Sequence, residues 1–489
     1  MIGKQSCGRF LLVAGVAASM VVWLTASASA QSTQPAYRED RILIMPKAGV
    51  NLAALDNFHL ARKGEVLRTF DGIGHLQVLH VPQGETVSSL ISQYQKSGLV
   101  EFAELDYVGH VYDTEPNETS FANGTLWGLT NISAAAAWDV LTSASNIVVA
   151  VVDTGVRYTH EDLASNMWVN PVDGSHGWNA INGNNNPNDN GGFTISHGTL
   201  VAGVIGAVGN NGKGVVGVAW RLQIMACQWL NNYPGSGTVS GCITCLDYAR
   251  TNGARIINAS WGFPTNSLAL SNAIVSLRTA GIILVAACGN STTNIDTNPT
   301  YPSGLQLDNI VSVAATTSND TLSAYSNYGA TNVLLAAPGD NIFSTVSATD
   351  SYYGYGTGTS MAAPYVSGAC ALLMAQYPTD SYQQIIRRLL SATDPLPSLA
   401  GKCRTGGRLN LRKALRTILI ATIPATNSGP FQLRVSGGLN RTCSVEASTN
   451  LTSWSPVFTN TTSANGTFDF ADDQSTNLPQ RFFRATAAP

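Results

Sequence analysis

The chain has 489 residues, of which 44% are apolar and 12% are charged, and its formal net charge is −3. This length allows two or three domains, and this apolar fraction fills a sizeable core, which excludes a disordered chain. The net charge is small and no basic run or basic-aromatic stripe occurs, which excludes nucleic acid as an expected partner.

Residues 1–30 have the pattern of a cleaved secretory signal peptide. Lys4 and Arg9 precede an apolar run over 10–24, and an A-x-A cleavage signal follows at 28–30. The alternative is a membrane anchor, but this run is shorter than the roughly 20 residues that a spanning helix needs. No later segment is long and apolar enough to cross a bilayer. We therefore expect a secreted protein, extracellular or at the cell surface, without an integral membrane anchor.

Export makes disulfides possible. One of the eight cysteines, Cys7, belongs to the signal peptide, and the odd number that remains leaves at least one thiol unpaired within the chain. Cys242 and Cys245 form a C-x-x-C motif, but a second such motif and a nearby His, which a zinc site needs, are both missing. The sequence favours a local disulfide, with Cys227 as one available partner, or small buried side chains.

Residues 31–115 are expected to form a small α+β domain. Apolar periodicity predicts strands and helices in alternation, at 41–45, 52–60, 75–80, 87–94 and 100–107. A linker with turn and breaker residues follows at 113–118.

Residues 120–418 have the pattern of a doubly wound α/β domain. Short runs rich in Ile, Val and Leu occur at 147–152, 255–258, 282–286 and 310–313. Such runs suit strands that are buried on both faces, which indicates a parallel sheet flanked by helices. Helices are predicted over 198–208, 241–252, 268–280 and 360–376.

Residues 425–489 differ in character from the rest of the chain. Short alternating strands at 431–435, 443–447 and 481–484 are separated by turns rich in Gly, Asn and Ser. They predict a small β-sandwich, and this region contains no catalytic constellation.

Three side chains lie where an open α/β sheet collects reactive groups, at strand ends and helix starts. Asp153 ends the first buried strand, His197 opens a helix, and Ser360 lies among small residues at a loop-to-helix junction. Singly, these are ordinary turn, helix-entry and N-cap residues. Together they predict nucleophilic catalysis, in which the serine attacks a carbonyl, the histidine moves its proton and the aspartate orients the imidazole.

Four sequence blocks resemble those of the subtilisin-like serine peptidases. They stand at 152–155, 197–203, 286–290 and 358–364, and the likeness extends over about 120–418. The resemblance implies a serine endopeptidase that hydrolyses peptide bonds through an acyl-enzyme. It also implies that Asn290 binds the developing oxyanion together with the backbone N–H of Ser360. The rival hypothesis is a catalytically silent protein that binds a surface or polymer and uses the α/β domain as a scaffold.

The same resemblance suggests where a substrate would bind. Stretch 258–262 is similar to the family's edge strand, which pairs with extended substrate backbone. Cys288 stands where a small residue is usual, so it is either a reactive thiol or a small buried side chain. We expect a broad or apolar preference before the cut. The predicted substrate-binding residues are Ser260, Trp261, Gly262, Ala287, Cys288 and Gly289.

Two loops suggest structural calcium. Asp162 and Asn211 resemble the family's calcium ligands, and the carbonyls of Gly209, Lys213 and Val215 would complete the oxygen shell. A second candidate is the Asn-rich loop 182–192, which carries Asp189. The alternative is a pair of polar turns. No catalytic metal or organic cofactor is expected.

The family resemblance also assigns a role to residues 31–115. They would act as a propeptide that assists folding of the parallel sheet, occupies the cleft as an intramolecular inhibitor and is cut off between residues 108 and 118. An N-terminal domain that stays attached is the alternative. The expected partners are protein or peptide substrates, and the mature protein is expected to be a monomer.

Overall fold

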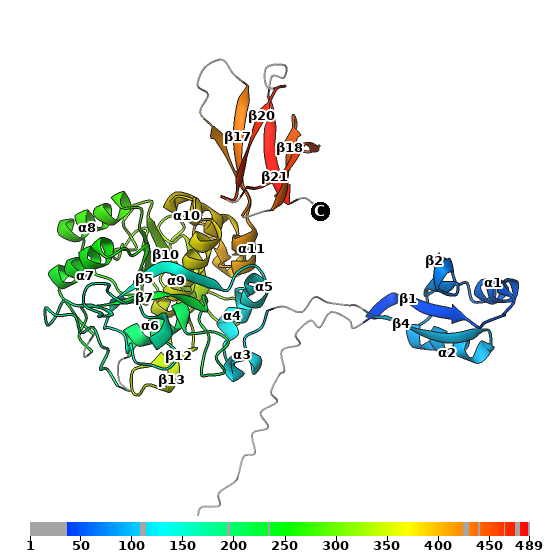
Figure 1. Ribbon diagram of the computed structural model, residues 1–489, viewed down its shortest axis with the longest axis horizontal. Coiled ribbons are helices and arrows are strands. Elements are labelled where there is room, and N and C mark those ends of the chain that lie inside the picture. Colours follow the sequence, from blue (N-terminus) through cyan, green and yellow to red (C-terminus); the bar gives the residue numbers. More distant parts are fainter. Residues whose placement is uncertain are drawn as a thin grey trace, which may run out of the picture. The chain divides into compact units, whose positions relative to one another are not determined.

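The computed structural model describes residues 37–107, 114–192, 196–232, 235–423, 430–438, 441–463, 465–474 and 480–487 (Figure 1). The predicted signal peptide lies outside these residues. The chain divides into two compact units, with the boundary between Tyr112 and Asp113. Across the described ranges, no helix has the length and hydropathy needed to cross a membrane.

The first unit is an antiparallel sheet in the order β2-β3-β1-β4 with two helices. Its core is built by alternation, since Ile42 and Ile44 of β1 are buried against Leu55 of α1 and Leu90 of α2. Thr86 caps α2 by accepting from the N–H of Ser89. The elements are β1 (Tyr37–Pro46), α1 (Leu52–Ala61), β2 (Val66–Phe70), β3 (Leu76–His80), α2 (Val87–Ser97) and β4 (Val100–Tyr107).

The predicted α+β fold of this unit is confirmed, but the sequence did not predict β2. That strand is an exposed edge of the sheet, so its residues lack the alternation of buried and exposed positions that marks a strand in a sequence.

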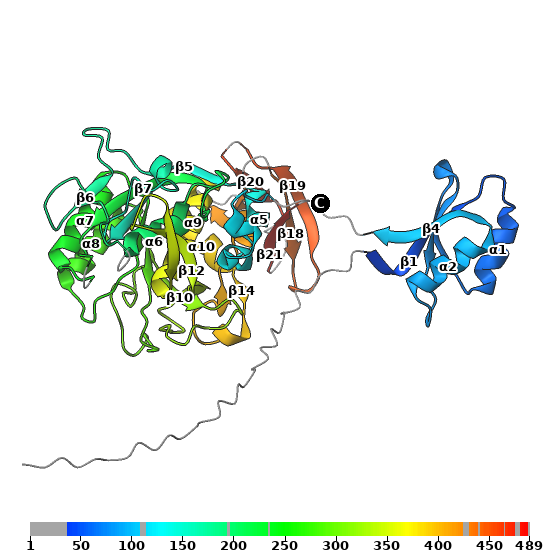
Figure 2. The same cartoon turned by 90° about the horizontal axis from the view of Figure 1, so that it is seen from below.

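The second unit is built on a nine-stranded sheet in the order β14-β15-β11-β10-β9-β8-β5-β7-β6 (Figures 1 and 2). Every pairing is parallel except that between β14 and β15. The strands are β5 (Ser143–Asp153), β6 (Gly177–Asn179), β7 (Arg221–Gln228), β8 (Ile256–Ala259), β9 (Ile283–Ala287), β10 (Ile310–Thr316), β11 (Leu335–Pro338), β14 (Asp394–Pro395) and β15 (Gly407–Arg408). A separate hairpin is formed by β12 (Ile342–Val346) and β13 (Tyr352–Gly356).

Helices cover both faces of this sheet. Val149 and Val151 of β5 belong to the core beneath α6 and α9, while Val148 and Val152 belong to the core beneath α7 and α8. The helices are α3 (Thr119–Ala122), α4 (Trp127–Asn131), α5 (Ala134–Trp138), α6 (His197–Gly206), α7 (Val239–Thr251), α8 (Leu268–Thr279), α9 (Thr359–Gln376), α10 (Tyr382–Ser391) and α11 (Leu411–Arg416). The predicted doubly wound architecture is confirmed.

The C-terminal part of this unit is a β-sandwich of two three-stranded sheets, β16-β17-β20 and β19-β18-β21. Its first strand already begins at Leu419, before the expected start at residue 425. The strands are β16 (Leu419–Ile423), β17 (Phe431–Ser436), β18 (Thr442–Ser448), β19 (Ser455–Thr461), β20 (Thr467–Asp472) and β21 (Phe482–Ala487). Inward-facing Leu433, Val435, Val445 and Phe470 form its core.

A buried arginine joins the sandwich to the α/β part. Arg388 of α10 has a fully buried side chain, and its Nε donates to Asp380 Oδ2 at 2.6 Å. The same guanidinium donates to the carbonyl of Ser436 in β17 and lies 3.4 Å from the centre of the Tyr377 ring. The sandwich is thus anchored through a desolvated charge pair.

Candidate active site

The strand register brings the candidate residues to one edge of the sheet. Asp153 at the end of β5 is level with Gln228 at the end of β7, and Val151 is level with Asn258 in β8. The segments that follow β5, β7, β8 and β9 therefore leave the sheet at the same carboxyl edge.

Asp153 and His197 form a direct pair at this edge. The imidazole Nδ1 of His197, the first residue of α6, lies 2.7 Å from Asp153 Oδ1, and the aspartate is completely buried. Burial lowers the pKa of His197, but the charge and the hydrogen bond of Asp153 outweigh this effect and raise the pKa above its ordinary value. Gly198 permits this approach, because a Cβ there would lie 2.0 Å from the carbonyl oxygen of Gly155.

Ser360 is the second residue of α9 and is bonded reciprocally to Ser260. The hydroxyl of Ser360 donates to the carbonyl of Ser260 at 3.0 Å, and the hydroxyl of Ser260 donates to the carbonyl of Ser360 at 2.8 Å. A helical carbonyl normally accepts from the residue four positions later, which here is Pro364 and has no N–H. The proline thus leaves this carbonyl open to the side chain of Ser260.

Asn290 lies beside the same helix start. Its Oδ1 accepts from the backbone N–H and the hydroxyl of Thr359, both at 2.8 Å. These two bonds orient the amide so that Nδ2 faces the loop before α9, where a Cβ on Gly358 would lie 3.1 Å from it. Gly358 has φ +149°, a conformation that side chains rarely adopt. The NH2 group of Asn290 therefore lies beside the N-terminus of α9.

A cleft of about 520 Å³ opens next to His197 and Ser260. Three of the predicted substrate-binding residues, Ser260, Trp261 and Gly262, line this cleft, whereas Ala287, Cys288 and Gly289 are not among its lining residues. The remaining lining residues are Thr154, Trp229, Leu230, Gly235, Ser236, Gly237 and Phe263.

The side chain of Trp261 is held in place by neighbouring groups at the cleft. Its indole N–H donates to the carbonyl of Val152 at 2.7 Å, and its ring packs edge-on against Trp229 with centroids 5.0 Å apart. Phe263 packs against both tryptophans. The sequence did not single out Trp229 and Phe263, because each is an isolated aromatic residue after a strand.

The cysteines are small buried side chains. All seven cysteines in the described residues are buried free thiols. The structure therefore contains no disulfide with Cys227 among them, and the alternative role as small buried side chains applies. Burial raises the pKa of Cys288 to about 12, and its thiol donates to the carbonyl of Asn327 at 3.1 Å. A reactive thiol beside Asn290 is therefore not supported.

The first calcium candidate contains a residue that the sequence did not reveal. Asp162 accepts from Asn211 Nδ2 at 2.7 Å and from the N–H of Val215 at 3.0 Å. Glu118 accepts from the N–H of Asn211 at 2.7 Å, while its Oε2 is buried and has no hydrogen-bond partner in the described part of the chain. From the sequence, Glu118 was placed at the end of the predicted linker 113–118 and had no predicted role. No group of three or more His, Cys, Asp or Glu side chains that could hold a metal occurs in the described ranges.

The second calcium candidate is not supported. Asp189 is completely buried, and both of its oxygens accept hydrogen bonds from the protein, from Thr199, Gly191 and Asn232 among others. The carboxylate is therefore already occupied by donors from the segments beside His197.

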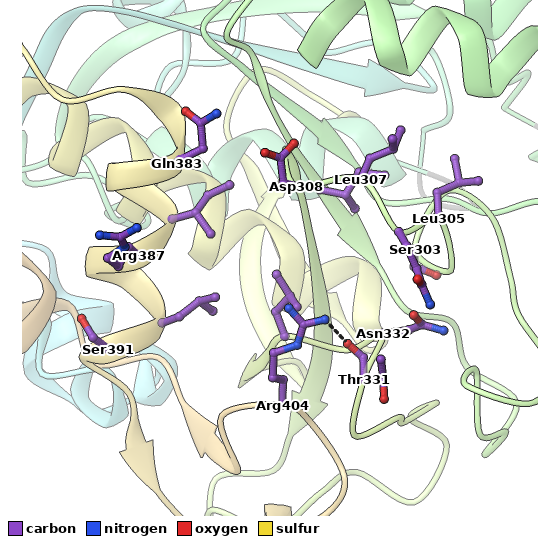
Figure 3. A pocket seen from close by; sticks show the side chains of 15 residues that line it. Ser303, Leu305, Leu307, Asp308, Thr331, Asn332, Gln383, Arg387, Ser391 and Arg404 are labelled. Carbon is purple, nitrogen blue, oxygen red and sulfur yellow. Dashed lines mark hydrogen bonds between the residues drawn. The ribbon is translucent and has the colours of Figure 1, made fainter. Parts of the chain in front are cut away.

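A larger cavity of about 750 Å³ lies elsewhere, between α10 and the segments that precede β10 and β11 (Figure 3). Leu305, Leu307, Arg387 and Arg404 are among its lining residues. Because it lies at the amino ends of these parallel strands, it is separate from the edge where Asp153 and His197 meet. Its size alone does not make it the reactive site.

Comparison with known families agrees with this geometry. A model described as "Subtilase family" matches residues 144–419, and one described as "Fervidolysin N-terminal prodomain" matches residues 24–106. The chain belongs to the subtilase family. It is a subtilisin-like serine endopeptidase, and the N-terminal unit matches a prodomain.

Individual relatives extend this result. The chain is 34% identical over 329 residues to "Thermophilic serine proteinase" of Bacillus sp. (strain AK1), a match that covers 67% of this chain and 76% of that protein. It is 35% identical over 301 residues to "Thermitase" of Thermoactinomyces vulgaris, covering 62% and 99%. A solved protease structure from Pseudoalteromonas arctica has a TM-score of 0.53 and 30% identity, covering 61% of this chain and 98% of that one.

Proposed function

We propose that this subtilase cleaves peptide bonds with Asp153, His197 and Ser360 as a catalytic triad. The observation that carries the proposal is the 2.7 Å contact between His197 Nδ1 and Asp153 Oδ1. With Nδ1 engaged by Asp153, Nε2 is the nitrogen left for proton transfer, and His197 lines the cleft together with Ser260. Ser360 is hydrogen-bonded to that same Ser260.

The reaction begins when the Ser360 hydroxyl turns from the Ser260 carbonyl toward His197. His197 takes the proton as Ser360 attacks the scissile carbonyl, and then delivers it to the leaving amine. A water molecule hydrolyses the resulting acyl-enzyme by the same route. Asp153 stabilises the imidazolium in both halves, which agrees with the raised pKa of His197 that remains after the opposing effect of burial.

The developing oxyanion would bind between Asn290 Nδ2 and the backbone N–H of Ser360. The two bonds from Thr359 hold the Asn290 amide in place before the substrate arrives, so no reorganisation is needed during the reaction. The first N–H groups of a helix have no acceptor four residues earlier within the helix, which makes the start of α9 suited to negative charge.

The cleft supports protein or peptide substrates with a broad or apolar preference. Gly235, Gly237 and Gly262 leave backbone accessible for pairing with an extended peptide, while Trp229 and Phe263 add apolar surface. Gly237 is required there, because a Cβ would lie 2.3 Å from the carbonyl oxygen of Trp229.

A structural Ca²⁺ fits the cluster around loop 209–215. Glu118 has a buried oxygen that no donor among the described residues reaches, and Asp162 supplies a second carboxylate, which suits a cation that prefers oxygen ligands. Asn211 now turns its NH2 group toward Asp162, so it would bind the ion with its amide flipped. The ion would fix the loop and take no part in the chemistry.

The N-terminal unit would act as an intramolecular inhibitor that is removed on maturation, and residues 1–30 would direct export. The prodomain match over residues 24–106 supports the inhibitor role. The domain boundaries at 31–115, 120–418 and 425–489 and the monomeric state remain predictions.

Labelling with a fluorophosphonate tests the triad. The reagent is expected to modify Ser360 alone, and Ser360→Ala is expected to abolish labelling, casein clearance and removal of the N-terminal unit. Ser276→Ala is the matched control, because this exposed hydroxyl only donates to a carbonyl within α8. Labelling or casein clearance that survives in Ser360→Ala would refute the proposal, and a silent binding protein would then be the better description.

A further inference from the structure

Asp189 is a buried carboxylate next to the Asp153–His197 pair. Its side chain is completely buried, yet none of the lysine and arginine side chains in the described residues forms an ion pair with it. A charge in such a place is stable only when hydrogen-bond donors surround it. Each of its two oxygens has a distinct set of donors.

The Oδ2 atom joins the two segments that carry the proposed triad. It accepts from the hydroxyl of Thr199 at 2.7 Å, from the N–H of Thr199 at 3.3 Å and from the hydroxyl of Thr154 at 3.4 Å. Thr199 lies two residues after His197, and Thr154 directly follows Asp153. Thr154 Oγ1 also accepts from the N–H of Gly198 at 2.9 Å, so one carboxylate oxygen ties the end of β5 to the first turn of α6.

The Oδ1 atom holds a different part of the site. It accepts from Asn232 Nδ2 at 2.9 Å and from the N–H of Gly191 at 3.0 Å. Asn232 follows Trp229 and Leu230, two residues that line the cleft. The wall of the cleft after β7 is therefore anchored to the same carboxylate as the triad segments.

We propose that Asp189 is a positioning residue that holds His197 in register with Asp153 through one oxygen and the substrate-binding wall through the other. It acts through Thr199, Thr154 and Asn232 and does not touch the substrate. The inference rests on the proposed triad, and it adds to that triad a residue on which both turnover and substrate binding depend.

The protonation behaviour of this carboxylate agrees with the geometry. Burial and, to a smaller extent, the charge of Asp153 raise the pKa of Asp189 to about 6, against the lowering effect of its hydrogen bonds. Two charged groups face Asp189, namely Asp153 at the end of β5 and His197 on α6. The side chains that donate to it are neutral: Thr154 after β5, Thr199 on α6 and Asn232 after β7. Protonation makes one oxygen a donor, so it opposes the N–H and O–H groups that now point at the carboxylate. Activity on the acid side should therefore depend on two protons, one on His197 and one on Asp189.

Asp189→Asn tests this role. It replaces one acceptor oxygen by an NH2 group that confronts donors, and we expect kcat to fall by about tenfold or more, a factor that corresponds to ~1.4 kcal/mol. The acid limb of log(kcat/KM) should also change from a slope approaching two to a slope of one. The matched control is Asp173→Asn, because Asp173 is an exposed carboxylate in a nearby turn that accepts from Ser175 and Asn185, and it should leave kcat, KM and the slope unchanged.

Two further variants separate the two oxygens and apply even if Asp189→Asn does not fold. Asn232→Ala removes a donor of Oδ1, so KM should rise severalfold while kcat and the rate of fluorophosphonate labelling stay near wild type. Thr199→Val removes the shortest bond to Oδ2, so kcat and the labelling rate should fall while KM stays near wild type. A wild-type slope of one, or the same change in kcat and KM for both variants, would overturn the inference. If the wild-type protein is neither labelled nor active, the proposed triad fails instead.

Discussion

The bond between the Ser260 hydroxyl and the Ser360 carbonyl gives a prediction that can be worked out from the helix itself. Ser260→Ala removes a donor at 2.8 Å, and Pro364 cannot replace it because it has no N–H. A partly buried carbonyl left without a donor costs about 1–3 kcal/mol. The Ser260 hydroxyl also accepts from Nδ2 of the buried Asn258 at 2.9 Å, so we expect the free energy of unfolding to fall by at least that amount.

Pro364→Ala provides a specific rescue. Alanine at this position restores the N–H that a regular helix directs at the Ser360 carbonyl, so it can replace the lost hydroxyl. Ser260→Ala should therefore cost less in the Pro364→Ala background than in wild type, with a coupling energy of about 0.5–1.5 kcal/mol. The effects of the two substitutions on the free energy of unfolding should therefore not be additive.

A double-mutant cycle measures this coupling. Urea unfolding is followed in four proteins that all carry Ser360→Ala, which prevents self-digestion and leaves the backbone carbonyl intact. Ser276→Ala combined with Pro364→Ala is the control, since this exposed serine bonds only within α8 and should show no coupling. If Ser260→Ala costs the same with and without Pro364, to within about 0.3 kcal/mol, the explanation of this bond is wrong.

Three further predictions follow from other parts of the second unit. Burial lowers the pKa of His197, but Asp153 raises it by more, so Asp153→Asn should lower kcat and move the acid limb of the kcat/KM profile to lower pH. An acid limb that stays at the same pH would contradict the assigned Asp153–His197 pair. Arg388→Met leaves the buried carboxylate of Asp380 unpaired and should destabilise the protein by about 3–5 kcal/mol in thermal unfolding. The control Arg434→Met removes an exposed ion pair and should cost at most about 1 kcal/mol. Equal losses of stability in the two variants would refute the reasoning. Chelation of Ca²⁺ should lower the melting temperature of the wild type, and Glu118→Gln should remove most of that difference; a shift that is the same in both proteins would exclude Glu118 as a ligand.

The architecture was predictable where the chemistry is local. The continuous apolar run of β5 and the small-residue segment that opens α9 indicated a parallel sheet and a buried helix, and both are confirmed. The strand β7 was harder to predict, because Gln223 and Cys227 interrupt its aliphatic pattern although the strand is paired on both sides.

The site residues were likewise predictable where the signal is local and not where it depends on contacts between distant segments. Asp153 and His197 stand in recognisable blocks, and their contact follows from the strand order. Trp261 was predicted as a substrate-binding residue and lines the cleft, but its hydrogen bond to the carbonyl of Val152, 109 residues earlier, could not be predicted from a local pattern. The contacts of Glu118 and Asp189 could not be predicted for the same reason, since their donors come from segments that only the folded chain brings together.

The position of Glu118 also limits where the chain can be processed. This residue is completely buried and holds the N–H groups of Asn211 and Gly212, so the second unit is already folded around it. A cut after Glu118 would remove a buried carboxylate from the loop it supports, whereas a cut before it leaves the loop intact. The N-terminal unit should therefore be released by cleavage on the N-terminal side of Glu118, and the new chain end would begin within a few residues of a fixed anchor.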